Sequence, residues 1–268
     1  MRSPGAAFDL RAGLSEEIRG AMQELGEAEA HPKAMHRCRL HLKRARALAR
    51  VGRAVAPGLS AVFNESARGV MHTLAQARDL AALAAAARSV GKKAAKKERA
   101  ALSAVAEALD AHRAALPPLN LEQVQASLRD LLALAQVWPE ASERQIERGA
   151  ERVARRARRA RRRGCGRAAS PPRHEWRKRE KDRLYVASLL GPAWPENRKR
   201  RKNCGEKLAN ALGHERDTLL LIDRLALEPN AAGSEKATGR ALRALKRARA
   251  HCARKADRIG VHLHRGGA

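Results

Sequence analysis

The stretch HRCRLHLKRARAL, residues 36–48, already indicates that this 268-residue chain is helical. An α-helix turns by about 100° per residue, which would gather the basic side chains of the stretch and its flank within about 80° of arc. These side chains are His36, Arg39, Lys43, Arg46 and Arg50. A separate apolar stripe consists of Met35, Cys38, Leu42, Ala45 and Ala49. The pattern predicts an amphipathic helix that buries one face and displays positive charge on the other.

Helical spacing continues through the rest of the chain, and no segment keeps the alternation of a half-buried strand. Pro and Gly residues separate the helical segments. We predict helices at residues 7–28, 33–52, 58–88, 92–114, 120–137, 140–164, 172–190, 196–227 and 235–260. The chain has only two Phe, one Tyr and three Trp, which favours tightly packed helices of Ala, Leu and Val over a β-rich core. The predicted fold class is all-α.

An internal repeat relates the two halves of the chain. The pattern His36-x-x-Arg39-x-x-x-Lys43 returns as His174-x-x-Arg177-x-x-x-Lys181, 138 positions later (174 − 36 = 138). The same offset relates Pro57 to Pro195, Leu74 to Leu212, Arg78-Asp79 to Arg216-Asp217 and Leu83 to Leu221. An ungapped register that holds His, Pro and Asp in both copies indicates two related helical lobes, with 163–172 as the linker between them.

The charge of the chain predicts a densely negative partner. Lys and Arg number 56 against 28 Asp and Glu, which gives a net charge of +28. Nucleic acid, polyphosphate and anionic membrane are the candidate partners. A codon bias that raises Arg and Ala together does not account for acids being half as frequent as bases.

Two further predicted helices carry basic stripes opposite apolar ones. The first stripe consists of Arg148, Arg152, Arg155, Arg159 and Arg162. The second consists of Arg240, Arg243, Arg247, His251, Arg254 and Arg258. One such stripe alone is more often a solvated surface. Because like charges one turn apart destabilise a helix, three stripes with few interleaved acids indicate that a ligand supplies the missing negative charge.

The cysteines and the apolar runs predict neither a metal site nor a membrane span. Cys38, Cys165, Cys204 and Cys252 are far apart and form no C-x-x-C pair, which is typical of reduced structural thiols. The first residues lack the apolar region of a signal peptide, and the longest apolar run, 80–87, is too short to cross a bilayer. We therefore expect a cytoplasmic protein.

Both histidine motifs resemble the CHAD domain, the conserved histidine α-helical domain. HRCRLHLKRARAL from His36 and HEWRKREKDRLY from His174 carry the resemblance, and KLANALGHERD, 207–217, is similar to the family's later helix. The resemblance implies one domain over 7–262, made of lobe 1 (7–165) and lobe 2 (171–262). It implies two pseudo-twofold-related, four-helix-bundle-like lobes around a basic central surface or pore. It also implies binding of inorganic polyphosphate and association with polyphosphate granules, without a cofactor.

Candidate ligand groups follow from the resemblance and from the stripes. The family motif implies His36, Arg39, Lys43, Arg44 and Arg46 in the first copy, and His174, Arg177, Lys178, Lys181 and Lys207 in the second. The basic stripes add Arg50, Arg152, Arg155, Arg159, Arg247, His251 and Arg254. The family places Arg ten residues after the His, whereas this chain has Arg183-Leu184 in swapped order. Arg183 would lie about 180° from His174, so we do not assign it to the site.

These residue types suit a phosphate polymer. Arg offers a planar fork to two phosphate oxygens, Lys acts as a mobile point charge, and both can follow a repeating anion. A histidine gains its proton more easily beside an arriving phosphate, so binding should tighten as pH falls from 8 to 6. We expect Asp79 and Asp217 to pair with Arg or to cap turns. The sequence contains neither the clustered carboxylates nor the Gly-rich loop of phosphoanhydride hydrolases, so we expect no catalysis and no metal.

Two alternatives stay open. The first is sequence-independent RNA or DNA binding through the Arg-rich helix at 148–163, against which stands the scarcity of aromatic side chains that could stack on bases. The second is a helical scaffold that its basic faces hold on a granule or membrane surface. The preferred hypothesis requires both histidine motifs to line one shared basic surface.

Overall fold

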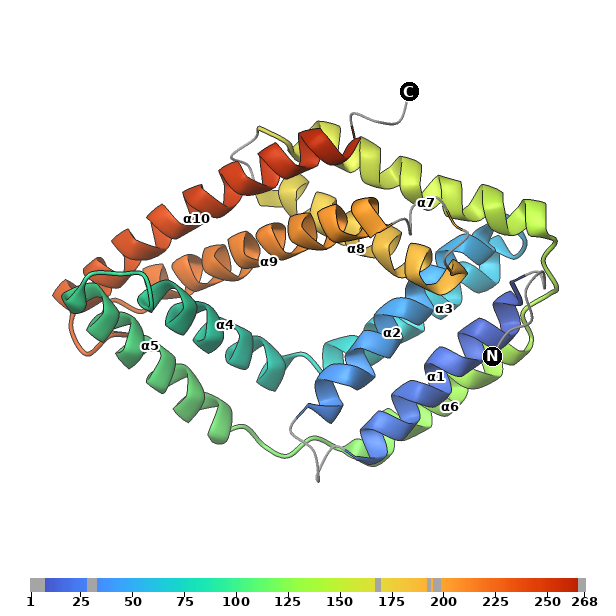
Figure 1. Ribbon diagram of the computed structural model, residues 1–268. Helices are drawn as coiled ribbons and strands as arrows, with labels where there is room; N and C mark the ends of the chain where they lie inside the picture. The colour runs from blue at the N-terminus through green and yellow to red at the C-terminus, as the bar shows by residue number, and fades with distance from the viewer. Residues whose placement is uncertain (1–7, 28–32, 167–169, 192–193, 195–198, 265–268) are drawn as a thin grey trace. The chain divides into compact units, whose positions relative to one another are not determined.

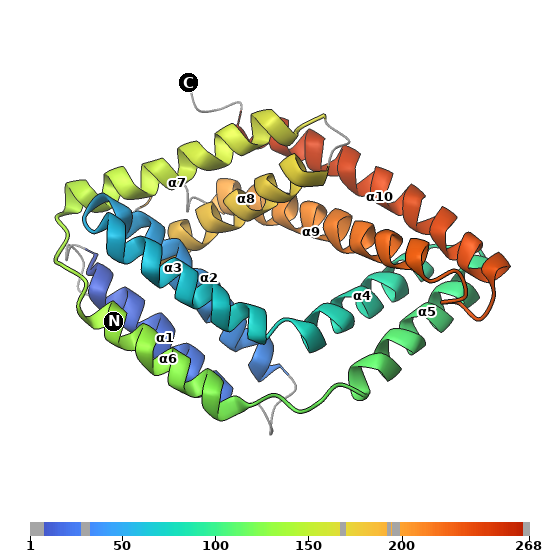
Figure 2. The ribbon, with the colours of Figure 1, turned by 180° about the vertical axis from the view of Figure 1, so that it is seen from behind.

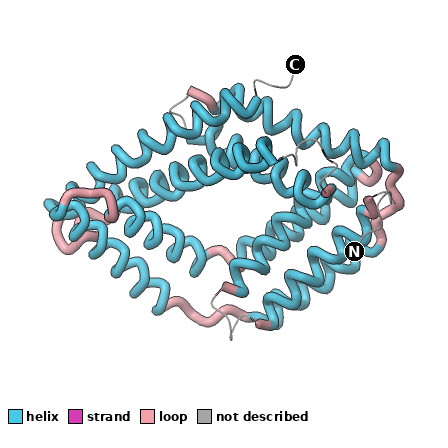
Figure 3. The backbone as a smooth tube through the Cα atoms, in the orientation of Figure 1, coloured by secondary structure: helices cyan, strands magenta, loops and turns pink. Residues whose placement is uncertain are grey.

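The computed structural model describes residues 8–27, 33–166, 170–191, 194 and 199–264. Within these ranges the chain forms ten α-helices and one 3₁₀ turn, and contains no strand (Figure 3). The helices, labelled in Figure 1, are α1 (Leu10–Gly26), α2 (Ala34–Val51), α3 (Pro57–Thr73), α4 (Gln76–Gly91), α5 (Lys96–Ala114), α6 (Leu121–Gln136), α7 (Glu143–Gly164), α8 (Ser170–Leu190), α9 (Lys199–Leu227) and α10 (Glu235–His264). The prediction of an all-α fold is confirmed.

Local sequence signals explain several helix starts. The Asp9 carboxylate accepts a hydrogen bond from the Ala12 amide at 2.9 Å, and the Asn120 side chain accepts one from the Gln123 amide at 2.9 Å. Each satisfies an amide that the first turn leaves without a helical partner. Pro57 starts α3, where its fixed φ suits a helix and its missing N–H costs nothing.

One predicted helix is wrong. We expected a continuous helix at 58–88, but the structure ends α3 at Thr73 and begins α4 at Gln76. The Leu74 amide still bonds the Val70 carbonyl, and the Asp79 amide bonds the Ala75 carbonyl, so each helix closes its own hydrogen bonds. Neither Pro nor Gly marks the break, and Leu74 is buried. Tertiary packing therefore overrides the helical preference of this Ala-rich stretch.

The chain divides into two compact units, each built from three segments. Unit 1 comprises Met1–Leu74, Leu119–Arg162 and Lys178–Asn203, and unit 2 comprises Ala75–Pro118, Arg163–Arg177 and Cys204–Ala268. Both units therefore draw helices from both halves of the sequence. The lobes 7–165 and 171–262 stay a prediction. The chain leaves unit 1 at the unpredicted α3–α4 break. The pseudo-twofold bundle arrangement around a central surface stays a prediction.

The core of unit 1 lies among α1, α2, α3 and α6, which Figures 1 and 2 show side by side. Its largest fully buried side chains include Phe63 and Trp138, whose rings meet edge to face with centroids 5.8 Å apart. A Cβ at Gly149 of α7 would lie 2.3 Å from the Val51 carbonyl oxygen. Only glycine allows α7 to approach the end of α2 this closely.

The core of unit 2 is built mainly by α4, α5, α9 and α10. Small Ala residues and Leu102, Leu221 and Leu245 fill it, all three of these leucines being fully buried. Trp176, on the part of α8 that belongs to unit 2, is also fully buried. A Cβ at Gly260 of α10 would lie 2.3 Å from its ring, so a glycine is needed where α10 crosses the indole.

Candidate anion-binding site

The helix α2 carries the first histidine motif in unit 1 and has the predicted two faces. Cys38, Leu42, Ala45 and Ala49 are fully buried. His36 is exposed, and Lys43, Arg46 and Arg50 are half-buried. The two faces are therefore separated as expected except at Arg39, which is buried although it was predicted on the displayed cationic face.

Two of the predicted cations on α2, Arg39 and Arg44, form polar contacts with neighbouring helices of unit 1. Arg39 is only 6% exposed, and its Nη1 donates to the Met71 carbonyl oxygen at 2.5 Å, which places the guanidinium between α2 and α3. Arg44 Nη2 lies 3.0 Å from Oε1 of the buried Glu17, whose Oε2 lies 2.8 Å from His41 Nδ1. Sequence reasoning missed Glu17, because a single acid on the predicted first helix gives no sign of its partner.

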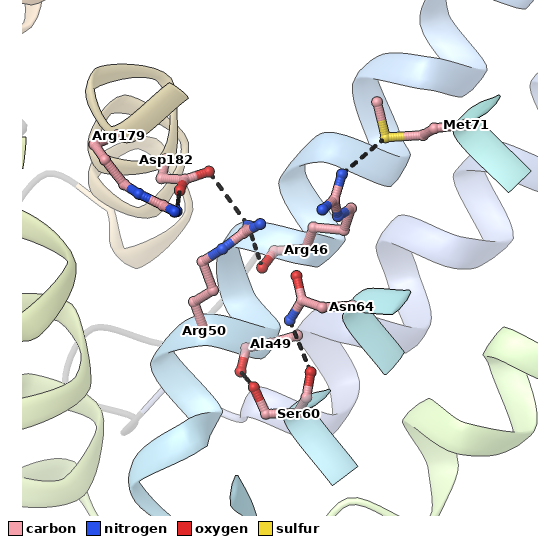
Figure 4. A network of polar contacts seen from close by, with 8 residues as sticks. All are labelled: Arg46, Ala49, Arg50, Ser60, Asn64, Met71, Arg179 and Asp182. Atoms are coloured by element: carbon pink, nitrogen blue, oxygen red, sulfur yellow. Dashed lines mark hydrogen bonds and ion pairs between the residues drawn. The ribbon is translucent and has the colours of Figure 1, made fainter. Parts of the chain in front are cut away.

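Arg46 and Arg50 form a cationic network with the part of α8 that belongs to unit 1 (Figure 4). Arg50 Nη1 donates to the Arg46 carbonyl oxygen at 2.9 Å and to Asp182 Oδ1 at 3.3 Å. Arg179 Nη1 donates to the other oxygen of Asp182 at 2.9 Å. Arg46 Nη1 lies 3.6 Å from the Met71 sulfur. Burial, followed by the charge of Arg50, lowers the pKa of Arg46 to about 10.

The second motif, on α8, divides between the units. His174 and Arg177 belong to unit 2, whereas Lys178 and Lys181 belong to unit 1. His174 is half-buried beside a small cavity that Glu215 and Arg216 also line. The expectation that both histidine motifs line one shared surface stays a prediction.

Lys178 is exposed, and the Lys181 ammonium lies 5.9 Å from the centroid of the Tyr185 ring. Arg177 is half-buried, and a Cβ added at Gly213 of α9 would lie 3.5 Å from its Nε. A Cβ at 213 would make only ordinary van der Waals contact with this guanidinium, which therefore packs against α9 without requiring a glycine there.

Arg173, next to His174, is a buried charge that sequence reasoning missed. Its guanidinium donates to both oxygens of Glu215, at 2.5 and 2.7 Å, and to Asp257 Oδ1 at 2.7 Å. Burial alone lowers the pKa of Arg173, but the hydrogen bonds to Glu215 and Asp257 outweigh it and raise the pKa. The fork of Arg173 therefore joins α8, α9 and α10 beside the second histidine.

Arg183 is a buried charge on α8. Its side chain is 2% exposed and its Nη2 lies 2.9 Å from Oε1 of Glu180, which is fully buried. The two residues correspond, at the offset of 138, to the apolar Ala45 and Leu42. The swapped Arg-Leu order thus places Arg183 in a buried position, and its exclusion from the site stays a prediction.

The helix α7 presents a cationic surface on unit 1. Ile146, Ala150, Val153 and Ala157 are at most 5% exposed. The opposite face exposes the predicted residues Arg152, Arg155 and Arg159. Arg155 pairs with Glu151 at 3.3 Å, whereas neither Arg152 nor Arg159 forms an ion pair within the described part of the chain.

The predicted groups on unit 2 are mostly exposed. Lys207 of α9 and His251 and Arg254 of α10 face solvent. Arg247 Nη2 donates to both oxygens of Glu98, at 2.7 Å each. The hydrogen bond from Arg247 lowers the pKa of Glu98. Arg247 therefore has an intramolecular counter-charge that the sequence did not indicate.

Acidic and thiol groups give little sign of metal chemistry. Among the described residues, no group of three or more His, Cys, Asp or Glu side chains could hold a metal ion. The four cysteines are free thiols, and burial raises the pKa of Cys38 to about 11. Asp79 pairs with Arg78 at 2.7 Å, as expected, and lies with Asp217 on one pocket of unit 2. No described helix is both long and apolar enough to cross a bilayer.

The arrangement suits an extended anion on chemical grounds. Each unit carries exposed or half-buried cations on helices that also contribute buried side chains to its core. No curated protein matches the chain. The model of one family, the CHAD domain, matches residues 12–226, which include both histidine motifs and end before α10. The chain belongs to the CHAD domain family.

Proposed function

We propose that the chain binds inorganic polyphosphate and catalyses no reaction on it. The observation that carries the proposal is its membership of the CHAD family, which is associated with polyphosphate binding. The net charge of +28 supports it, because a polymer with about one negative charge per phosphate can neutralise many cations at once.

The faces of α2 and α7 support the proposal in unit 1. Arg50 and Arg46 are half-buried, so water screens an approaching phosphate less than it would at an exposed side chain. Arg152 and Arg159 form no ion pair in the described part of the chain, whereas Arg155 pairs with Glu151. Binding a polyanion there relieves the repulsion between like charges along α7.

Calorimetry with polyphosphates of graded length tests the proposal. Lys43→Ala should weaken binding about tenfold, because a charge-assisted hydrogen bond contributes about 1.5 kcal/mol. Arg129→Ala is the matched control. Arg129 is exposed on α6 of the same unit, and its substitution also removes one positive charge. Equal losses in the two variants would mean that binding is diffuse and that α2 has no special role.

Nucleic-acid binding is the second candidate, and the exposed arginines of α7 favour it. A helix with exposed Arg152, Arg155 and Arg159 can contact a duplex or RNA backbone without reading sequence. A competition experiment separates the two functions. If RNA or duplex DNA displaces long-chain polyphosphate at matched charge and moderate salt, nucleic acid is the better ligand.

We also propose that the protein associates with polyphosphate granules in the cytoplasm. The same basic faces would hold it there. A fluorescent fusion should colocalise with granules and become diffuse in cells unable to make polyphosphate. A fusion that keeps its localisation in such cells contradicts this part of the proposal.

A further inference from the structure

Asp182 is a carboxylate placed among the cations of α2 and α8. Its Oδ1 accepts from Arg50 at 3.3 Å and its Oδ2 from Arg179 at 2.9 Å (Figure 4). Its side chain is 12% exposed. One oxygen on each of two guanidinium groups is also the arrangement that a phosphate group offers.

A third arginine, Arg46, lies close to this carboxylate. Arg46 lies one helical turn before Arg50, and its Nε is buried with no hydrogen-bond partner in the described part of the chain. Burial and the neighbouring Arg50 lower the pKa of Arg46, while Asp182 acts in the opposite direction. Asp182 therefore bonds two arginines directly and acts electrostatically on a third, so its charge stabilises these arginines near one another.

The internal repeat shows that an acid is not needed at this position of the motif. Asp182 corresponds to Arg44 at the offset of 138, so the charge is reversed between the copies. Arg44 meets its own acid, Glu17, on α1. In the second copy, the acid stands on the motif helix itself and reaches the arginine of the first copy.

We propose that Asp182 is an internal competitor of the anionic ligand: it occupies the position between Arg50 and Arg179 that a phosphate group would take, and thereby weakens binding. The inference rests on the proposed function and concerns the regulation of that same site. A ligand phosphate must displace the carboxylate or share the guanidinium groups with it. Removing the charge of Asp182 should therefore increase the affinity for polyphosphate. If Asp182 only held the helices in place, the same substitution would reduce that affinity.

The test compares the full-length wild-type chain with Asp182→Asn and Asp182→Ser, titrated with long-chain polyphosphate and with tripolyphosphate at fixed salt. Asp130→Asn is the control. Asp130 is exposed on α6 of the same unit, and its substitution raises the net charge by the same single unit. We expect the Asp182 variants to bind about tenfold more tightly than the control, and the decrease of log K with log salt to steepen by about one.

Circular dichroism and a thermal melt report whether each variant is folded, and Asp182→Ser gives a second neutral side chain where Asn does not fit. If wild type binds and folded Asp182 variants bind no more tightly than Asp130→Asn, the competition is wrong and the proposed function stands. If no variant binds either probe, both are wrong. If only the Asp182 variants bind, the competition is supported in its strongest form.

Discussion

At the scale of single residues, several buried charges hold the helices together, and Arg173 is the most connected. It is 4% exposed and meets the carboxylates of Glu215 and Asp257. Arg173→Met should reduce the free energy of unfolding by about 3–5 kcal/mol, because it leaves Glu215 buried without its partner. Urea denaturation followed by circular dichroism measures the effect. Arg88→Met, which removes a half-exposed ion pair with Asp110, should cost under about 1 kcal/mol.

The buried pair Glu180–Arg183 allows a prediction from the internal repeat. The first copy has Leu42 and Ala45 at the corresponding positions. Replacing the pair by Glu180→Leu with Arg183→Ala should leave stability unchanged or raise it by about 1–4 kcal/mol, since both desolvated charges disappear together. Glu180→Leu alone should destabilise by about 3–5 kcal/mol, because Arg183 then stays buried without that carboxylate. A double variant that is less stable than the single one contradicts the prediction.

Residue-level reasoning from sequence found the cationic groups but not their partners. The pattern placed His36, Lys43 and Arg50 on one helix face correctly, because a helical period fixes directions on a single element. Arg39 shares that face, whereas Arg44 lies about 100° around the helix from Lys43. Arg39 bonds a backbone carbonyl and Arg44 bonds Glu17. Partners on other elements depend on tertiary packing, which a single sequence without its contacts does not reveal.

At the scale of elements, the helices were predicted where punctuation is strong. Pro57, Asn120 and Ser142 begin helices by capping or by a fixed φ, and the expected boundaries lie close to those observed. The α3–α4 break was missed, because Leu74 and Ala75 carry no turn signal. That break lies where the chain passes from unit 1 to unit 2. We infer that it is determined by packing, because α3 packs into the core of unit 1 and α4 into the core of unit 2.

Two glycines in helices should respond to alanine with opposite signs. A Cβ at Gly69 of α3 meets nothing within 4 Å, whereas one at Gly149 of α7 would lie 2.3 Å from the Val51 carbonyl oxygen. Gly69→Ala should stabilise by about 0.5–1 kcal/mol, since alanine loses less backbone entropy in a helix. Gly149→Ala should destabilise by about 1–3 kcal/mol, because α7 must move away from α2. Thermal melts of the two variants provide the comparison, and equal shifts would contradict it.

At the scale of the whole molecule, net charge competes with individual ion pairs. Salt screens surface pairs such as Arg88–Asp110 and Arg247–Glu98, which lowers stability slightly. Salt also screens the repulsion produced by a net charge of +28, which raises stability. Because exposed pairs contribute about 0–1 kcal/mol each, we expect repulsion to dominate. The melting temperature should increase between 50 and 500 mM NaCl, and a decrease would mean that ion pairs prevail.

Ligand length is the property that distinguishes a chain with several cationic faces from one with a single phosphate pocket. The candidate arginines are distributed over three helices, with Arg50 on α2, Arg152 and Arg159 on α7, and Arg254 on α10. Once one face holds a long polymer, the other faces meet its remaining phosphates at a high effective concentration, which can raise affinity by about 10²–10⁴. Tripolyphosphate is too short to gain this advantage. Calorimetry at equal total phosphate should therefore show affinity per phosphate that rises with chain length, and the Arg152→Ala, Arg159→Ala double variant should lose more affinity for long polymers than for tripolyphosphate. If affinity per phosphate is the same at every length, the faces act independently and the polymer gains nothing from being continuous.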